Sequence, residues 1–524
     1  MLFRSRCFWQ SQGDRTIKFT EVSQLAGGEL VGTEVTIRAR LASVRSKGKL
    51  AFVTLRAGLD TVQLTVSADV VPREMVGWVA KVPKESIVEV IGQVVTVETP
   101  LTGYSIKDVE VHVKKLYVIS KAMAMLPIQV EDCERPQSVI DERNAAVEGL
   151  LVQIKENTAA LAAGDLTEEG KKELEAKGKQ LKSQLDRTPR YVEVSQPERL
   201  DNRVIDLRTT TNQAIFRISS LVGHLFRSYC FERGMVEIHT PKILGAASEG
   251  GANVFKLQYF DRPAFLAQSP QLYKQMCVAA DFPGVYEVGP VFRAENSNTL
   301  RHLTEFTGLD VEMPIKEHYH EVLEFFGGLF RAIFSGIPKH CARELEAIRQ
   351  QFPFEDFLYF EEKPLILRFE EGINLLHQHG HGLHLTIEDD LDTESEKILG
   401  NLIRQQYHTD FYMLDKFPLK VRPFYTMPDP YDGRWSNSYD FFMRGQEIVS
   451  GAQRIHDPEL LTQRAKEHNI PIDTIKPYID SFKYGAPPHA GGGIGLERVV
   501  FLYLGLTNIR RTSIFPRDPQ RITP

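Results

Sequence analysis

Short apolar segments separated by turn residues occupy the first quarter of the chain. Five stretches rich in Val, Ile and Thr follow one another between residues 30 and 118, with Gly, Pro and charged residues between them, and this pattern predicts strands. The predicted strands cover 34–41, 50–56, 61–67, 87–97 and 109–119. Five strands so close together favour a small barrel of the oligonucleotide-binding type (OB-fold), although an SH3-like barrel or a sandwich shares the pattern.

Between residues 140 and 188 the apolar positions change from strand spacing to helical spacing. Val, Leu and Ile recur three or four residues apart in 147–161, and Leu recurs in a similar way in 174–185. Gly164 and Asp165 interrupt the pattern between the two runs. The sequence therefore predicts a solvated helical hairpin inserted in a linker, either as a spacer or as an arm that contacts RNA.

From residue 206 onward, helical and strand patterns are mixed. Helices are predicted over 213–229 and 496–504, strands over 286–293, 305–312, 411–414 and 447–453, and a glycine-rich turn over 491–495. Because no strand–helix–strand repeat dominates, the predicted sheet is antiparallel and the fold class is α+β. The predicted domains are an N-terminal extension (1–29), the barrel (30–120), the linker with its hairpin (121–205) and the mixed domain (206–524).

Composition narrows the function classes. The chain has 524 residues, 42% hydrophobic and 25% charged, which is typical of a globular protein. No apolar run approaches the roughly 18 residues that span a bilayer, so we expect no membrane partner. The five cysteines are an odd number, lie far apart and form no C-x-x-C pair. They favour a cytoplasmic protein over a disulfide-bonded or zinc-stabilised one.

The charge of the chain is unevenly distributed. The formal net charge is -6, yet the first 120 residues carry 16 Lys and Arg against 12 Asp and Glu. A mildly basic barrel would suit a polyanionic partner such as a nucleic acid, although chance explains this excess equally well.

Two segments near the middle of the chain combine cations, carboxylates and an aromatic ring. Side chains alternate faces on a hairpin. Arg293 and Glu295 would therefore share one face of the hairpin. Phe306 and Asp310 on the next strand can share the surface that faces them, so that all four side chains meet. This mixture suggests a binding site rather than the alternative, a surface patch of salt bridges.

Two further segments offer ligands for a metal or a nucleotide. Glu447 and Ser450 are placed to offer oxygen atoms to a hard cation such as Mg²⁺. The glycine-rich segment 491–495 fits neither the dinucleotide-binding fingerprint nor the P-loop. A turn followed by Glu497 and Arg498 could still cradle a nucleotide.

Together these segments resemble the class II aminoacyl-tRNA synthetases, most closely the aspartyl-tRNA synthetases of eukaryotes and archaea. The family's motif 1 is similar to 234–251, motif 2 to 292–306 and motif 3 to 493–498. The resemblance covers about residues 30–130 and 195–524, which leaves out the hairpin. It implies an antiparallel catalytic sheet flanked by helices, with the OB-fold barrel preceding it.

The reaction that the resemblance implies is the ATP-dependent ligation of L-aspartate to tRNA(Asp) through an aspartyl-adenylate, with release of AMP and diphosphate. The attacking carboxylate is already ionised at neutral pH, so catalysis depends on positioning and charge stabilisation, by Arg293 and Arg498. The implied ATP-binding residues are Arg293, Glu295, Arg301, His302, Phe306, Glu447 and Arg498. The implied Mg²⁺ ligands are Glu447 and Ser450, although the family often has two adjacent acids where this chain has Gln446-Glu447.

Selection of aspartate requires cations for its side-chain carboxylate. The resemblance assigns that role to Lys274 and Arg454, and it assigns the ammonium group to Glu249, Gln271 and Asp310. An asparaginyl-tRNA synthetase of the same fold is the nearest alternative, but that family typically lacks the lysine. The other alternative is a synthetase-derived RNA-binding protein without ligase activity, in which the catalytic arginines would have no purpose.

The resemblance also implies how the protein meets its tRNA and a second copy of itself. Phe52 would stack on an anticodon base, Gln63 and Glu110 would bond base edges, and Arg45 would meet phosphates. Motif 1 forms a dimer interface in the family, so we expect a homodimer with Pro241 at its centre.

Overall fold

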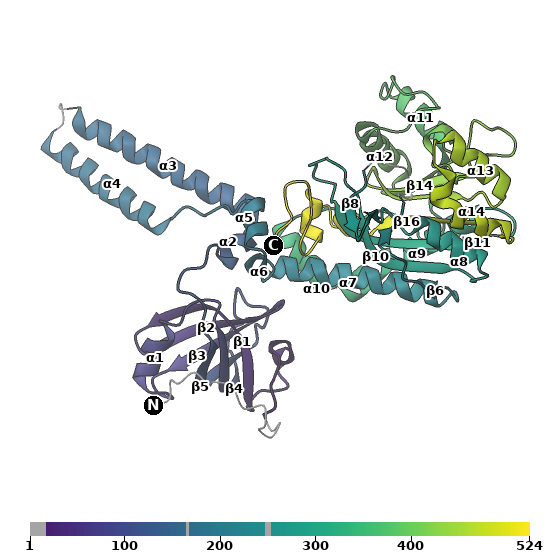
Figure 1. Cartoon of the computed structure of the whole chain (residues 1–524). Coiled ribbons are helices and arrows are strands. Elements are labelled where there is room, and N and C mark those ends of the chain that lie inside the picture. The colour runs from purple at the N-terminus through teal and green to yellow at the C-terminus, as the bar shows by residue number, and fades with distance from the viewer. Residues whose placement is uncertain (1–16, 164–166, 247–252) are drawn as a thin grey trace. The chain divides into compact units, whose positions relative to one another are not determined.

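The computed structural model describes residues 17–163, 167–246 and 253–524. The chain divides into two compact units, Met1–Gln213 and Ala214–Pro524, and the boundary falls inside helix α7 (Thr210–Phe231). Each unit contains its own main sheet, and Figure 1 labels many of their elements. No helix in the described ranges is long and apolar enough to cross a membrane.

A closed barrel forms the first part of the N-terminal unit. Its strand order is β1-β2-β3-β5-β4, and β3 and β5 are the parallel neighbours. The strands are β1 (Glu34–Lys47), β2 (Leu50–Ala57), β3 (Asp60–Ser67), β4 (Ile87–Thr96) and β5 (Val109–Ser120). The prediction of five strands closing into an OB-type barrel is therefore confirmed.

Alternating burial explains why these strands close around a core. Val53, Leu55 and Leu64 are fully buried, whereas Thr54 and Gln63, which directly adjoin them on the strands, are partly exposed. The short helices η1 (Val22–Leu25) and α1 (Arg73–Val79) add apolar side chains to the same core. The barrel core thus begins before residue 30.

The rest of the N-terminal unit is helical. The hairpin consists of α3 (Gln137–Ala162) and α4 (Glu168–Arg187), which confirms the helical prediction, while Gly164 and Asp165 lie outside the described residues. Asn157 is buried in its seam and donates a hydrogen bond to the carbonyl of Leu174, 3.0 Å away. The other helices are α2 (Val130–Glu134), α5 (Gln196–Asp201) and α6 (Arg203–Asp206).

A large, mostly antiparallel sheet forms the centre of the C-terminal unit. Its order is β12-β13-β14-β15-β16-β11-β10-β6, and only the outermost described pairs, β12·β13 and β10·β6, are parallel. Its strands are β6 (Val236–Glu237), β10 (Val285–Phe292), β11 (Glu305–Pro314), β12 (Leu365–Arg368), β13 (Phe411–Asp415), β14 (Ser438–Met443), β15 (Gln446–Gln453) and β16 (His489–Gly495). The predicted α+β class is confirmed.

Helices and a small second sheet complete this unit. The small sheet contains β7 (Ile243–Leu244), β8 (Lys256–Tyr259) and β9 (Arg262–Leu266). The helices are α8 (Gln271–Ala279), α9 (His320–His340), α10 (Ala342–Gln351), α11 (Phe369–Gln378), α12 (Thr393–Tyr407), α13 (Pro458–Glu467), α14 (Lys476–Lys483) and α15 (Leu496–Tyr503), with η2 (Leu419–Val421), η3 (Ile472–Ile475) and η4 (Ile509–Thr512).

The glycine-rich segment is a central strand and not the predicted turn. Strand β16 lies between β15 and β11, and its glycines make room for neighbours rather than for a bend. A Cβ on Gly491 would lie 2.1 Å from the carbonyl oxygen of Val311 and 2.4 Å from the carboxylate of Glu312. The glycines of β16 therefore leave space for the buried carboxylate beside the strand. Because glycines have no side chains, the segment shows no alternation of polar and apolar residues from which a strand could be predicted.

The two faces of the large sheet have different partners. Phe441 on β14 packs edge-to-face against Phe326 of α9, with ring centroids 5.5 Å apart. Its neighbour Asp440 points to the opposite face, as alternation requires, and lines a cleft there. The fold thus places an apolar layer behind the sheet and polar side chains in front of it.

Candidate active site

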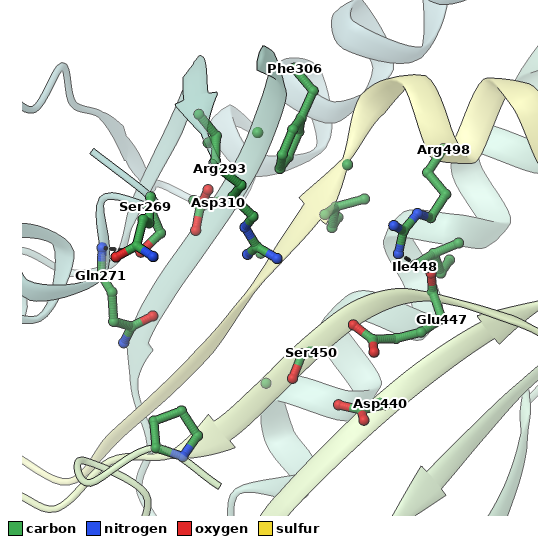
Figure 2. A pocket seen from close by; sticks show the side chains of 18 of the residues that line it. Ser269, Gln271, Arg293, Phe306, Asp310, Asp440, Glu447, Ile448, Ser450 and Arg498 are labelled. Carbon is green, nitrogen blue, oxygen red and sulfur yellow. Dashed lines mark hydrogen bonds between the residues drawn. The ribbon is translucent and has the colours of Figure 1, made fainter. Parts of the chain in front are cut away.

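A cleft of about 460 Å³ lies on the front face of the large sheet. Strands β11, β14, β15 and β16, helix α15 and the segment that follows β10 contribute its walls. The sequence-predicted residues that line it are Gln271, Arg293, Glu295, Arg301, His302, Phe306, Asp310, Glu447, Ser450, Arg454 and Arg498. Figure 2 shows Arg293 and Asp310 on one side, Arg498 and Glu447 on the other, and Ser450 with Asp440 between them on the floor.

At one end of the cleft, the lining residues Asp310 and Arg454 form buried ion pairs with Lys274 and Glu312, which lie behind the wall. Lys274 and Arg454 are 2% and 3% exposed. The Lys274 ammonium lies 3.0 Å from Asp310 and 3.5 Å from Glu312. Arg454 donates two hydrogen bonds to the Glu312 carboxylate, at 2.9 and 3.1 Å. We call these four residues the charged quartet.

The quartet holds its charges in a fixed arrangement. Burial tends to raise the pKa of Glu312, but Arg454 and Lys274 outweigh it and lower that pKa, so the carboxylate stays ionised. Two cations thus face two carboxylates. Sequence reasoning missed Glu312, although its position two residues after Asp310 on one strand places both on the same face.

Two other residues predicted to bind the amino acid are Gln271 and Glu249. Gln271 is 5% exposed, and its Nε2 atom is buried with no hydrogen-bond partner in the described part of the chain. Such an atom fits a site that a polar ligand completes. Glu249 lies outside the described residues.

The opposite end of the cleft is less enclosed. Arg293 and Glu295 follow strand β10 rather than lying on it, since the strand ends at Phe292. The Arg293 guanidinium lies 5.7 Å from the centre of the Phe306 ring. Arg498 reaches across the sheet and donates a hydrogen bond to the backbone carbonyl of Glu447, 3.0 Å away.

The loop between β10 and β11 is attached to helix α12. Arg301 donates to the Glu396 carboxylate at 3.2 Å and also contacts Thr393. His302 bonds Thr299 at 2.6 Å, and burial lowers its pKa, which favours the neutral ring. Both loop residues line the cleft and are engaged with protein groups.

Oxygen atoms gather on the floor of the cleft. Ser450 and Asp440 are directly paired across β14 and β15, and Arg422 donates to both, at 3.0 Å to the hydroxyl and at 2.7 and 3.0 Å to the carboxylate. Burial and the neighbouring Glu447 carboxylate raise the pKa of Asp440, although Arg422 opposes them. Sequence reasoning missed Asp440, because only strand pairing brings it opposite Ser450.

A second buried acid lies close to this floor. Burial and the Glu447 carboxylate raise the pKa of Glu396 to about 7. Crowded carboxylates of this kind are stabilised in their ionised form by a divalent cation. In the described ranges no group of three or more His, Cys, Asp or Glu side chains is arranged as a metal site, so a cation here would need oxygen atoms from Ser450, substrate or water as well.

The predicted anticodon residues lie together on the outer face of the barrel. Arg45 and Phe52 are paired across β1 and β2. Gln63 donates a hydrogen bond of 2.7 Å to Glu110 on β5. Thr65, the residue paired with Phe52, bonds the same carboxylate oxygen at 2.8 Å.

His112 is a further member of this face that sequence reasoning missed. Its Nε2 atom lies 2.7 Å from the second Glu110 oxygen. Burial tends to raise the pKa of Glu110, but the hydrogen bonds from Gln63, His112 and Thr65 outweigh it and lower the pKa. The carboxylate is therefore held ionised and oriented at the barrel surface.

Pro241, the predicted centre of a dimer interface, is exposed. It lies between Thr240 and Lys242, both of which bond the Glu287 carboxylate, at 2.7 and 2.6 Å. These contacts fix the backbone around the proline, while its own ring faces solvent in the single chain.

Family models match both units of the chain. The model described as "tRNA synthetases class II (D, K and N)" matches residues 195–519, and the model of the OB-fold nucleic acid binding domain matches residues 35–119. Together they cover the barrel and the large sheet with its cleft.

Individual proteins match over nearly the whole chain. The cytoplasmic aspartate–tRNA ligase of Homo sapiens is 50% identical over 94% of this chain and 88% of its own length, and cytoplasmic enzyme 1 of Dictyostelium discoideum is 49% identical over 98% and 87%. The aspartyl-tRNA synthetase structure from Entamoeba histolytica has a TM-score of 0.84 at 44% identity, covering 100% of this chain and 97% of that one. An asparaginyl-tRNA synthetase from Pyrococcus horikoshii has a TM-score of 0.74 at only 26% identity, with coverages of 95% and 97%.

Proposed function

The chain belongs to the class II aminoacyl-tRNA synthetases and, within them, to the aspartate–tRNA ligases, and on that premise we propose how its residues perform the reaction. It ligates L-aspartate to tRNA at the expense of ATP. The observation that carries the assignment to residues is the meeting of Arg293, Asp310 and Arg454, from distant parts of the sequence, at one cleft, with Lys274 paired to Asp310 directly behind its wall. The tRNA acted on is tRNA(Asp).

In the activation step, the aspartate α-carboxylate attacks the α-phosphorus of ATP and diphosphate leaves. Arg293 neutralises the charge shared by the two approaching groups, because its guanidinium lies 5.7 Å from the Phe306 ring and on the same side of the cleft as Asp310. Phe306 and Arg498 enclose the adenine ring, and Glu295 accepts a hydrogen bond from its amino group. Arg301 and His302 turn from their protein partners toward the terminal phosphates.

The floor of the cleft fits a magnesium ion. Glu447 and Ser450 would hold it, with Asp440 as a further oxygen ligand or as an acceptor for its bound water, since these are hard oxygen donors beside crowded carboxylates. When bound, Mg²⁺ neutralises phosphate charge. The protein's own contribution is to hold Asp440 and Ser450 in register through Arg422.

Charge balance explains why aspartate is chosen over asparagine. The free quartet is balanced between two cations and two carboxylates. The ammonium group of bound aspartate would pair with Asp310, assisted by Gln271 and Glu249. Asp310 then neutralises Lys274 less completely, so the positive charge of the quartet is available to the substrate's side-chain carboxylate. Asparagine brings the ammonium group but no side-chain anion, so it leaves a buried cation without a partner, which is costly.

The barrel reads the anticodon of the tRNA. Phe52 offers a ring for base stacking, Arg45 lies beside it to meet phosphate, and Gln63 with Glu110 offers polar atoms to base edges. The division of labour follows the predicted domains: 30–120 binds the anticodon, 121–205 connects, and 206–524 carries the chemistry.

We further propose a homodimer in the cytoplasm. Motif 1 residues around Pro241 have an ordered backbone and an exposed proline ring, which suits a symmetric contact with a second copy. Sedimentation of the purified protein tests this directly. A monomer at micromolar concentration that remains fully active would contradict it.

Amino-acid-dependent exchange of pyrophosphate into ATP tests the function. We expect exchange with aspartate and none above background with asparagine. Exchange with asparagine alone would identify the alternative synthetase, and exchange with neither would identify an RNA-binding protein without ligase activity.

A further inference from the structure

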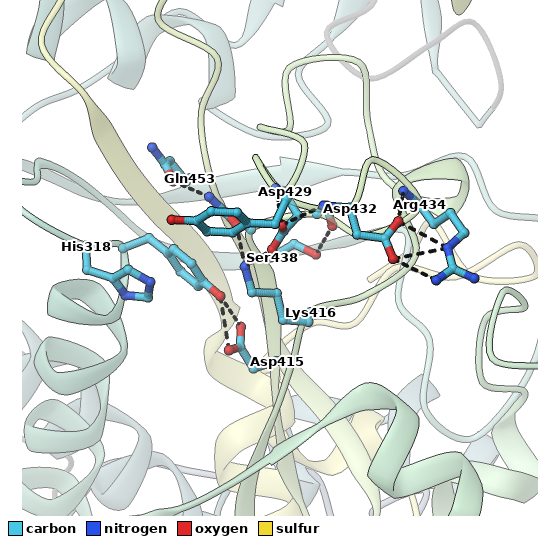
Figure 3. A network of polar contacts seen from close by, with 12 residues as sticks. His318, Asp415, Lys416, Asp429, Asp432, Arg434, Ser438 and Gln453 are labelled. Carbon is cyan, nitrogen blue, oxygen red and sulfur yellow. Dashed lines mark hydrogen bonds and ion pairs between the residues drawn. The ribbon is translucent and has the colours of Figure 1, made fainter.

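A second polar network lies outside the residues that line the cleft, and Figure 3 shows it around Asp415, Lys416 and Asp429. Its centre is Lys416, the residue after strand β13, whose side chain is only 17% exposed. The ammonium group forms an ion pair with Asp429 and donates to the amide oxygen of Asn437 at 2.6 Å. Lys416 has no place in the reaction described above.

The backbone at Lys416 is fixed from the side of helix α9. Tyr319 donates to both carboxylate oxygens of the preceding Asp415, at 2.8 and 3.0 Å, and His320 lies 2.8 Å from one of them. Lys416 itself has a positive φ of 63°, which is uncommon for a residue with a side chain. The surrounding contacts therefore hold this lysine in one place.

The contacts that begin at Lys416 also hold the loop 427–437 in its conformation. One Asp429 oxygen takes the ion pair, and the other accepts hydrogen bonds from the backbone nitrogens of Tyr431 and Asp432, at 2.8 and 3.1 Å. The backbone nitrogen of Asp429 donates to the carbonyl of Trp435 at 2.9 Å. The lysine thus supports a tight loop from inside.

Asn437 connects the network to the end of the cleft that contains Arg454, where we propose that aspartate binds. Its amide nitrogen donates to the side chain of Gln453 at 2.6 Å, and backbone hydrogen bonds of 2.8 to 3.0 Å link Asn437, Met427 and Gln453. Gln453 directly precedes Arg454. Arg454 in turn is bridged to Thr426, a fully buried residue of the cleft wall.

We propose that Lys416 is a positioning residue for aspartate recognition. By holding Asp429 and Asn437 together it clamps the loop 427–437 against the end of β15, and so fixes Arg454 and Thr426 where the substrate's side chain binds. Lys416 touches no reacting atom. Because misplacement of a binding group by about 1 Å can cost up to 10²-fold in rate, a clamp at one remove from the substrate has a measurable effect.

The clamp predicts a selective change in Michaelis constants. In pyrophosphate exchange, Lys416→Met should raise the KM for aspartate about tenfold and change the KM for ATP less than twofold. Lys416→Arg keeps the positive charge between Asp429 and Asn437 and should restore most of the aspartate affinity. Arg434→Ala is the matched control, because it breaks the exposed Arg434–Asp432 pair of the same loop without touching Gln453.

A second variant keeps the proposal testable should Lys416→Met fail to fold. Gln453→Met preserves volume but removes the acceptor for Asn437, so it should also raise the KM for aspartate selectively. An equal rise in both Michaelis constants, or no rise in a folded variant, would overturn the proposal. Since the proposal rests on aspartate ligation, absence of aspartate-dependent exchange in the unmodified protein would instead reject the proposed function.

Discussion

The two ends of the cleft are built in different ways. At the end where we propose that aspartate binds, the aspartate end, Lys274, Arg454, Asp310 and Glu312 are almost completely buried and already paired with one another. At the end where we propose that ATP binds, the nucleotide end, Arg293, Phe306 and Arg498 are partly exposed. The Arg293 guanidinium lies 5.7 Å from the Phe306 ring, and Arg498 donates to a backbone carbonyl at 3.0 Å.

This difference assigns different tasks to the two ends. A buried, balanced set of charges is costly to disturb and rigid, so it selects a ligand by charge. Partly exposed side chains can adjust their positions around ATP, the ligand that every synthetase of the class shares. Specificity is therefore expected to be preformed at one end, and nucleotide binding to complete the other.

The largest effect on stability is expected when an ion pair of the preformed aspartate end is removed. Arg454→Met removes one of the two cations that form ion pairs with the fully buried Glu312, so the free energy of unfolding should fall by about 3–5 kcal/mol. Chemical denaturation measures this. Adding Glu312→Gln should recover much of the stability without recovering aspartate-dependent exchange, and additive losses in the double variant would contradict the account of a coupled pair.

A slightly smaller effect is expected at Arg293, on the part of the nucleotide end that lies nearest to Asp310. Arg293→Ala removes the cation that faces the reacting groups, so kcat for pyrophosphate exchange should fall about 10²–10³-fold. The unfolding transition should stay close to that of the unmodified protein, because Arg293 is partly exposed. A change confined to the KM for ATP would instead make Arg293 a binding residue only.

At the nucleotide end the effect should be limited to ATP. Phe306→Ala removes a stacking surface worth about 1–3 kcal/mol, so the KM for ATP should rise about tenfold or more. The KM for aspartate should not change. A comparable rise in the KM for aspartate would show that the two ends are not independent.

The smallest effect is expected from a substitution in the barrel, which also serves as a control for the substitutions in the cleft. Gln63→Ala removes one donor to Glu110 but leaves those from Thr65 and His112. The loss of one hydrogen bond of about 1 kcal/mol should raise the KM for tRNA several-fold and leave pyrophosphate exchange unchanged. An altered exchange rate would mean that the substitution disturbs more than RNA binding.

The sequence predicted the parts of the molecule in which side chains show a pattern. The five barrel strands and helix α7 follow from alternation and helical spacing, and motif similarity located Lys274 and Arg454. Strand β16 was misread as a turn, because three adjacent glycines carry no pattern. Asp440 and Glu312 were missed because their partners, Arg422 and Arg454, come close only through strand pairing and folding.

The central claim is that buried cations at the preformed end choose aspartate, and Lys274→Met tests it most directly. Pyrophosphate exchange should be measured with aspartate and with asparagine, before and after the substitution. The account predicts that the variant loses at least about 10²-fold in kcat/KM for aspartate. A folded variant that retains normal aspartate-dependent exchange would contradict it.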